Sequence, residues 1–299
     1  MTMVATSEEA AEESATVRRA SNKTFWLLAP GMIWMLAFLV LPILMMVYVS
    51  FWTQTTFKIE PTLTLQSWVT FLTSPTYLGA LWTTIRIWLL VLISTLVVGY
   101  PAALFVGLLV KNKTLQTVLL VLCVIPFWTS FLIRVLAWRP MLGTEGAINM
   151  ILMKLGIVQQ PIEVLLFSEL SVIIGMTQIY CVFMVGPIAF MMGRIDASVI
   201  EAAQDLGAGF WRIFRTIILP LSMPGVVVGS IFVSVMVLGE FATAAALSGR
   251  KVNLLGNIIV TQVGSLKWAF AAVAGVILTI VMGAVIAALL RVVDLRKEL

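Results

Sequence analysis

The most regular feature of the chain is a series of six apolar runs without Asp, Glu, Lys or Arg. The runs are Thr24–Phe57, Ile87–Val110, Thr114–Ile133, Leu170–Gly193, Thr216–Gly239 and Trp268–Leu290. Each has 20 residues or more, and about 20 apolar residues allow a helix to cross a bilayer. We expect helices because the bilayer core holds no water to bond free backbone groups. The pattern predicts an all-α membrane protein with six transmembrane helices, roughly at 26–50, 84–110, 114–138, 170–193, 217–247 and 268–291.

Composition supports this interpretation. Of the 299 residues, 61% are hydrophobic and 11% are charged, and the mean hydropathy is +1.08. A soluble domain is near half apolar and a quarter charged, so this chain is too apolar to hide its side chains inside a water-facing shell. A soluble enzyme, a secreted disulfide scaffold and a disordered protein are excluded.

Basic residues predict the orientation of the six spans. An even number of spans places both termini on one side of the membrane. With the termini inside, the inner segments hold Arg18, Arg19, Lys23, Lys111, Lys113, Arg194, Arg212, Arg215, Arg291, Arg296 and Lys297. This majority of the 19 Lys and Arg residues predicts cytoplasmic termini, because cytoplasmic loops are enriched in positive charge. The expected organisation is a disordered cytoplasmic tail at 1–23, a six-helix transmembrane domain at 24–292 and a cytoplasmic tail at 293–299.

The inner loop at 194–216 is more structured than an ordinary connector. Ser198 and Glu201 have the spacing of a capping box, which begins a helix. Gly207 can adopt the left-handed conformation that ends one. Phe210, Trp211 and Phe214 then follow on a second short helical segment, and Pro220 comes where the next span begins. The loop is therefore predicted to form a helix–turn–helix on the cytoplasmic face, with a thin Ala-lined side that suits a groove on another protein.

The same loop carries a family motif. Glu201-Ala202-Ala203, three residues, Gly207, nine residues and Ile217-Ile218-Leu219-Pro220 resemble the EAA loop of permeases from binding-protein-dependent ABC transporters. The resemblance implies the type I ABC importer architecture. It also implies that this loop is the coupling helix that docks into a cytoplasmic ATPase. The residues to which it assigns coupling are Glu201, Ala202, Ala203, Gly207, Ile217, Leu219 and Pro220.

Three further blocks, at 126–138, 142–149 and 238–241, resemble spermidine/putrescine permeases of the PotB type. The resemblance implies a non-catalytic inner-membrane subunit that forms half of a pathway for a small cationic solute, most simply a polyamine. It further implies an ATPase dimer, a second permease of the PotC type and an extracytoplasmic binding protein as partners. ATP and Mg would belong to the ATPase. This chain would bind no cofactor, metal or nucleic acid.

Three ionisable residues, Arg86, Arg134 and Glu240, interrupt apolar segments. Such residues usually face the interior of a helix bundle or water. Glu240 follows Gly239, a plausible helix break, and either lines the pathway of a cation or forms an ion pair with Arg86 or Arg134. Tyr180, near the middle of the fourth span, either offers a ring face to a cation or packs with its hydroxyl bonded to a neighbouring helix.

Other patterns leave alternatives open. Ile148, Ile151, Leu152 and Leu155 fall on one face of a short helix that fits either the membrane surface or a docked partner. Gly225 and Gly229 form a GxxxG motif that suits a contact within the chain or with a second permease. A secondary carrier is disfavoured because internal repeats are absent from the sequence. A membrane enzyme is disfavoured by the absence of His and of paired intramembrane carboxylates.

The predicted topology is tested by single cysteines in a background without Cys123 and Cys181. A reagent that reacts only from outside should modify Cys at Thr62 and Gln159. It should not reach Cys at Asn112 and Gln204, which the topology places in the cytoplasm. The opposite labelling pattern contradicts the topology and, with it, a cytoplasmic coupling loop.

Overall fold

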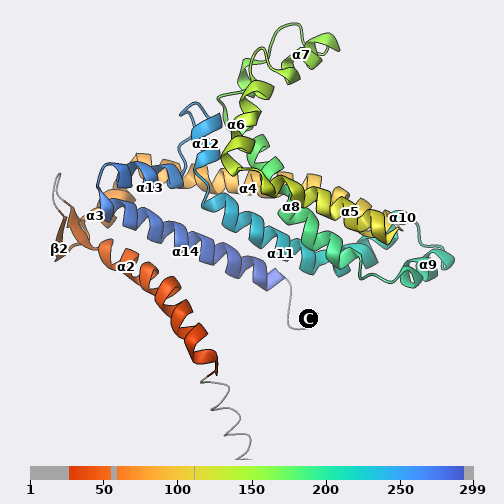
Figure 1. Cartoon of the computed structure of the whole chain (residues 1–299), viewed down its shortest axis with the longest axis horizontal. Helices are drawn as coiled ribbons and strands as arrows, with labels where there is room; N and C mark the ends of the chain where they lie inside the picture. The colour runs from red at the N-terminus through yellow and green to blue at the C-terminus, as the bar shows by residue number, and fades with distance from the viewer. Residues whose placement is uncertain (1–26, 55–58, 111, 293–299) are drawn as a thin grey trace, which may run out of the picture.

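The computed structural model describes residues 27–54, 59–110 and 112–292, most of which are helical (Figure 1). The two predicted tails, 1–23 and 293–299, lie outside the described residues. Five helices within the described part of the chain are long and apolar enough to cross a membrane. They are Leu27–Val49, Pro75–Leu109, Glu169–Met192, Phe210–Leu238 and Trp268–Arg291. A bent pair, Lys113–Trp128 and Phe131–Lys154, brings the number to six if it is one broken span.

The elements within these spans follow the apolar runs closely. They are η1 (Leu36–Val40), α2 (Leu41–Val49), α4 (Pro75–Leu104), η2 (Phe105–Leu109), α5 (Lys113–Val124), η3 (Ile125–Trp128), α6 (Phe131–Leu142), α8 (Glu169–Met192), α10 (Phe210–Ile213), η5 (Phe214–Ile218), α11 (Leu219–Leu238) and α14 (Trp268–Val292). The second span begins at Pro75 rather than near 84 as predicted, because Arg86 stays helical and Pro75 occupies the first turn, where its missing N–H costs little.

The span predicted at 114–138 is broken and is not one continuous helix. Its first part, α5, is followed by the 3₁₀ turn η3, which contains Pro126. Thr129 is extended and Ser130 is non-helical, and the next helix lies at 94° to the preceding one. Proline removes a backbone donor, and the two non-helical residues end the helical hydrogen bonding.

The fifth span is also shorter than the predicted 217–247. Its helix ends at Leu238 with Gly239 as the C-cap, and α12 (Ala242–Leu247) follows after the break. The plausible break at Gly239 is therefore confirmed. At its other end this span begins at Phe210. The π turn η5 lies just before Pro220 and lets the helix continue through a residue that has no N–H.

Shorter elements connect the spans. They are the antiparallel strands β1 (Trp52–Gln54) and β2 (Ile59–Leu63), α3 (Gln66–Thr73), α7 (Ala147–Lys154), η4 (Glu163–Leu165), α9 (Ala197–Asp205) and α13 (Leu255–Gly264). The helix predicted around Ile148–Leu155 is confirmed as α7, where Ile151 and Leu155 are exposed. Figure 1 shows α6 and α7 projecting from the bundle on the side opposite α2. The sequence pattern does not predict α13, which is too short to cross a membrane.

Helix α8 lies at the centre of the bundle and packs against both α4 and α11. Its fully buried stripe includes Met176, Met184, Ile188 and Met192. The two glycines of the GxxxG motif face this helix. A Cβ atom at Gly225 would lie 2.7 Å from the Pro187 carbonyl oxygen, and one at Gly229 would lie 3.1 Å from the Phe183 carbonyl oxygen. The motif therefore makes a contact within the chain, where it lets α11 approach α8 closely.

We expect Gly225→Ala to destabilise the protein by about 1–3 kcal/mol, because overpacking forces the two helices apart. The change should lower both the thermal unfolding midpoint in detergent and the abundance of the chain in the membrane. Gly283→Ala is a matched control, because a Cβ atom there meets nothing within 4 Å. Equal midpoints for the two variants would contradict the close α8–α11 contact.

Candidate functional site

The helix α9 and its flanking turns form the first candidate site. Asp196 is the N-cap of α9, and its Oδ1 atom accepts a hydrogen bond from the Ser198 N–H at 3.0 Å. The predicted capping box that starts at Ser198 is therefore wrong, because the cap lies two residues earlier. The backbone and side-chain hydrogen bonds with Ser198 lower the pKa of the Asp196 carboxyl. The negative charge that this favours lies at the positive end of the α9 helix dipole.

Gly207 ends this helix as predicted. Its φ of 77° lies in the left-handed region. The Ala208 N–H donates to the Ala203 carbonyl, five residues earlier, at 2.9 Å. This is the 6→1 hydrogen bond of a Schellman motif. A Cβ atom at Gly207 would meet nothing within 4 Å, so the requirement for glycine comes from the backbone angle and not from crowding.

Large apolar side chains surround the turn and face solvent. Leu206 is 87% exposed, Trp211 is 68% exposed and Phe210 is 58% exposed. Phe214 connects this group to the bundle, since its ring lies 5.8 Å from that of Tyr100 on α4. An apolar patch of this kind marks a contact with another protein or with the membrane surface.

The residues of the EAA motif lie on two elements. Glu201, Ala202 and Gly207 are exposed, whereas Ala203 is half-buried. Ile217 and Leu219 are half-buried and Pro220 is exposed, in and just after the π turn of the fifth span. The motif therefore joins an exposed helix to the base of α11, at the end of the bundle where Figure 1 shows α9 and α10.

Glu240 and Tyr180 form the second candidate site. Glu240 lies in the break between α11 and α12 and is only 7% exposed. The Tyr180 hydroxyl donates a hydrogen bond to the Glu240 carboxylate, and the Thr243 N–H donates another at 2.9 Å. The structure therefore brings together the two residues that were singled out separately, and it shows that Glu240 caps the short helix α12.

The ion-pair alternative for Glu240 is not what the structure shows. Arg86 pairs with Glu169 at the start of α8. Arg134 instead places its guanidinium over the ring of Phe127, 4.8 Å from the centroid. Within the described part of the chain, the Arg86–Glu169 pair is the one ion pair closer than 4.0 Å. Glu240 is thus held by hydrogen bonds from Tyr180 and Thr243 and not by a basic partner.

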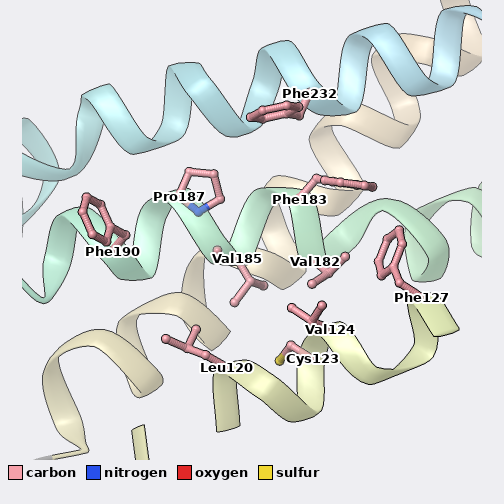
Figure 2. A pocket seen from close by; sticks show the side chains of 11 residues that line it. Leu120, Cys123, Val124, Phe127, Val182, Phe183, Val185, Pro187, Phe190 and Phe232 are labelled. Atoms are coloured by element: carbon pink, nitrogen blue, oxygen red, sulfur yellow. The ribbon is translucent and has the colours of Figure 1, made fainter. Parts of the chain in front are cut away.

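An apolar cavity of about 640 Å³ lies between α5, η3, α8 and α11 (Figure 2), and neither Glu240 nor Tyr180 is among the residues that line it. Phe127, Phe183 and Phe232 contribute their rings to its wall. The Phe127 and Phe183 centroids are 5.0 Å apart, and those of Phe183 and Phe232 are 6.1 Å apart. Phe183 is three residues after Tyr180, so both lie on one side of α8. The sequence analysis missed this cavity because its rings come from three separate segments.

No group of three or more His, Cys, Asp or Glu side chains among the described residues could hold a metal ion.

Comparison with known proteins places this geometry in a family. Residues 99–298 match the family described as "Binding-protein-dependent transport system inner membrane component". The spermidine/putrescine transport system permease protein PotB of Escherichia coli is 36% identical over 252 residues, which cover 84% of this chain and 90% of that protein. PotB of Haemophilus influenzae is 34% identical over 256 residues, 85% of this chain and 88% of that protein.

Solved structures show the same fold. A bacterial ABC transporter that imports the acidic polysaccharide alginate matches with a TM-score of 0.71 and 20% identity, covering 91% of this chain and 96% of that one. The alginate transporter in complex with its pentasaccharide-bound periplasmic protein matches with a TM-score of 0.68 and 18% identity, covering 90% and 94%.

This chain belongs to the inner-membrane permease components of binding-protein-dependent ABC transporters. It is therefore a multi-pass membrane transport subunit of the type I permease fold. The expected fold class and the family assigned from the EAA spacing are both confirmed.

Proposed function

We propose that this chain forms half of the translocation pathway of an ATP-driven polyamine importer, with Glu240 and Tyr180 on that pathway. The observation that carries the proposal is the buried Glu240 carboxylate, which accepts a hydrogen bond from Tyr180 in the break between α11 and α12. The PotB relatives, which are named for spermidine and putrescine transport, support the same class of solute.

The chemistry of the site fits a polyamine. Such a solute is a chain of ammonium groups separated by short methylene segments. A carboxylate attracts an ammonium group more strongly in a poorly hydrated site than in water. Aromatic faces add ~0.5–2 kcal/mol for a cation, and the methylene segments fit an apolar wall. A single carboxylate with aromatic neighbours attracts the solute and still allows its release.

The α9 loop is the proposed contact with the ATPase. Its exposed motif residues and the exposed side chains of Leu206 and Trp211 fit a cleft on a cytoplasmic ABC ATPase dimer. In this proposal ATP and Mg bind to the ATPase, and this chain binds no cofactor and catalyses no reaction. A second permease, homologous and of the PotC type, completes the pathway, and an extracytoplasmic binding protein delivers the solute. Both termini of this chain lie in the cytoplasm of a bacterial cell.

The pathway role of Glu240 is tested by Glu240→Gln. The amide keeps the size of the side chain and its acceptor oxygen but removes the negative charge. We expect putrescine and spermidine uptake by the reconstituted complex to fall by about tenfold, a loss of ~1.4 kcal/mol, while assembly and basal ATP hydrolysis stay near normal. Glu145→Gln removes an exposed carboxylate and should leave uptake unchanged. Full uptake by a stable Glu240→Gln complex would falsify the pathway role.

Coupling is tested by Gly207→Val. A β-branched residue is strained at a φ of 77°, so the variant should tilt α9 away from its docking position. ATPase binding and uptake should both fall several-fold, while the chain still inserts. Gly209→Val is the matched control, because Gly209 has a φ of −73° and open space around it. If the two variants bind the ATPase equally well, α9 is not the coupling helix.

A further inference from the structure

Arg134 is a half-buried charged residue near the start of α6. It follows the non-helical residues Thr129 and Ser130. Its guanidinium covers the ring of Phe127 at 4.8 Å, and its Nε atom is buried without an acceptor among the described residues. A charge in a membrane segment is costly and usually serves a function, so an incompletely bonded arginine at this position needs an explanation.

Glu240, the buried carboxylate that precedes α12, forms no ion pair with Arg134. Its partner Tyr180 lies on α8, and α6 is bonded to α8 two residues before Tyr180, where the Trp138 indole N–H donates to Gln178 at 3.3 Å. The α6 helix packs against α8, which carries Tyr180, and against α12, which follows Glu240. The protein thus gives the two charged groups separate contacts, an aromatic face for Arg134 and two hydrogen bonds for Glu240.

We propose that Arg134 is a tethered internal cation that competes with the transported ammonium group for the face of Phe127 and for the field of Glu240. The proposal rests on the proposed function and assigns a specificity-determining residue to it. In the described state Arg134 occupies one ring face that a solute cation would otherwise use. The entering ammonium group must displace the guanidinium or share the site with it. Arg134 therefore lowers the affinity of the site for the solute and speeds the release of the solute.

A structural role makes a different prediction. Phe127 belongs to η3 and Arg134 to α6, so their contact also crosses the 94° bend. If the contact only fixes this bend, then removing the charge should lower stability without strengthening the binding of a cation. Competition predicts the reverse, since removing a like charge from the site should strengthen cation binding.

The experiment uses the complete complex of both permeases and the ATPase. Equilibrium binding of labelled putrescine is measured in detergent without the binding protein, and turnover is measured in proteoliposomes with saturating solute-loaded binding protein. Arg134→Gln should bind putrescine roughly tenfold more tightly and turn over several-fold more slowly. Arg134→Lys keeps the charge and should resemble the unmodified complex. Arg139→Gln is the matched control, because Arg139 lies on the same helix over the Phe167 ring at 5.6 Å and should change neither quantity.

Each other outcome counts against the proposal. Unchanged putrescine affinity in Arg134→Gln overturns it, and a lower unfolding midpoint in the same variant would identify the structural role. Tighter binding in Arg139→Gln as well would show a general charge effect and would also overturn it. If the unmodified complex transports sugars or amino acids but no amine, the proposed function fails and this inference fails with it. That result is distinct, because it is seen without any substitution.

Discussion

Water is absent from the hydrocarbon core of a bilayer, so each backbone N–H and C=O group inside it must bond to another group of the protein. This requirement explains why the apolar runs become helices and why interruptions are informative. Non-helical backbone at membrane depth is tolerated where protein covers it or where it lines a wet cavity. Within the described residues, Thr129–Ser130 and Gly239–Phe241 are interruptions of this kind. Arg134 follows the first and Glu240 lies in the second, so the charges lie where the backbone already departs from a lipid-facing helix.

The packing of α8 against α11 connects these interruptions to the other end of the bundle. Tyr180 lies on α8, and Glu240 directly follows the C-cap of α11. The same two helices enter and leave the loop that contains α9. Gly225 and Gly229 let the two backbones approach closely. In the proposed coupling, a displacement of α9 would reach the Tyr180–Glu240 contact through these two closely packed helices.

Local features of the structure were predictable where local chemistry decides them. Gly207 is left-handed because no other residue adopts that conformation as easily, and its spacing from Glu201 identified the family. The break at Gly239 was predictable because a helix from 217 to 247 is longer than a bilayer needs. The bend after Trp128 was missed because charge-free composition continues through Thr129 and Ser130, and hydropathy does not distinguish a straight apolar segment from a bent one.

The sequence by itself determined that this is a membrane protein of about six spans with a structured connecting loop. Spans and turns depend on the composition of short stretches of consecutive residues, which the sequence contains directly. It also singled out Glu240, Tyr180 and Arg134 as unusual residues. Only the tertiary structure decided their partners. Arg86 pairs with Glu169, Glu240 bonds to Tyr180, and Arg134 packs on Phe127. Such pairings depend on how helices far apart in the sequence are rotated and packed, and the order of residues along one helix does not contain that information.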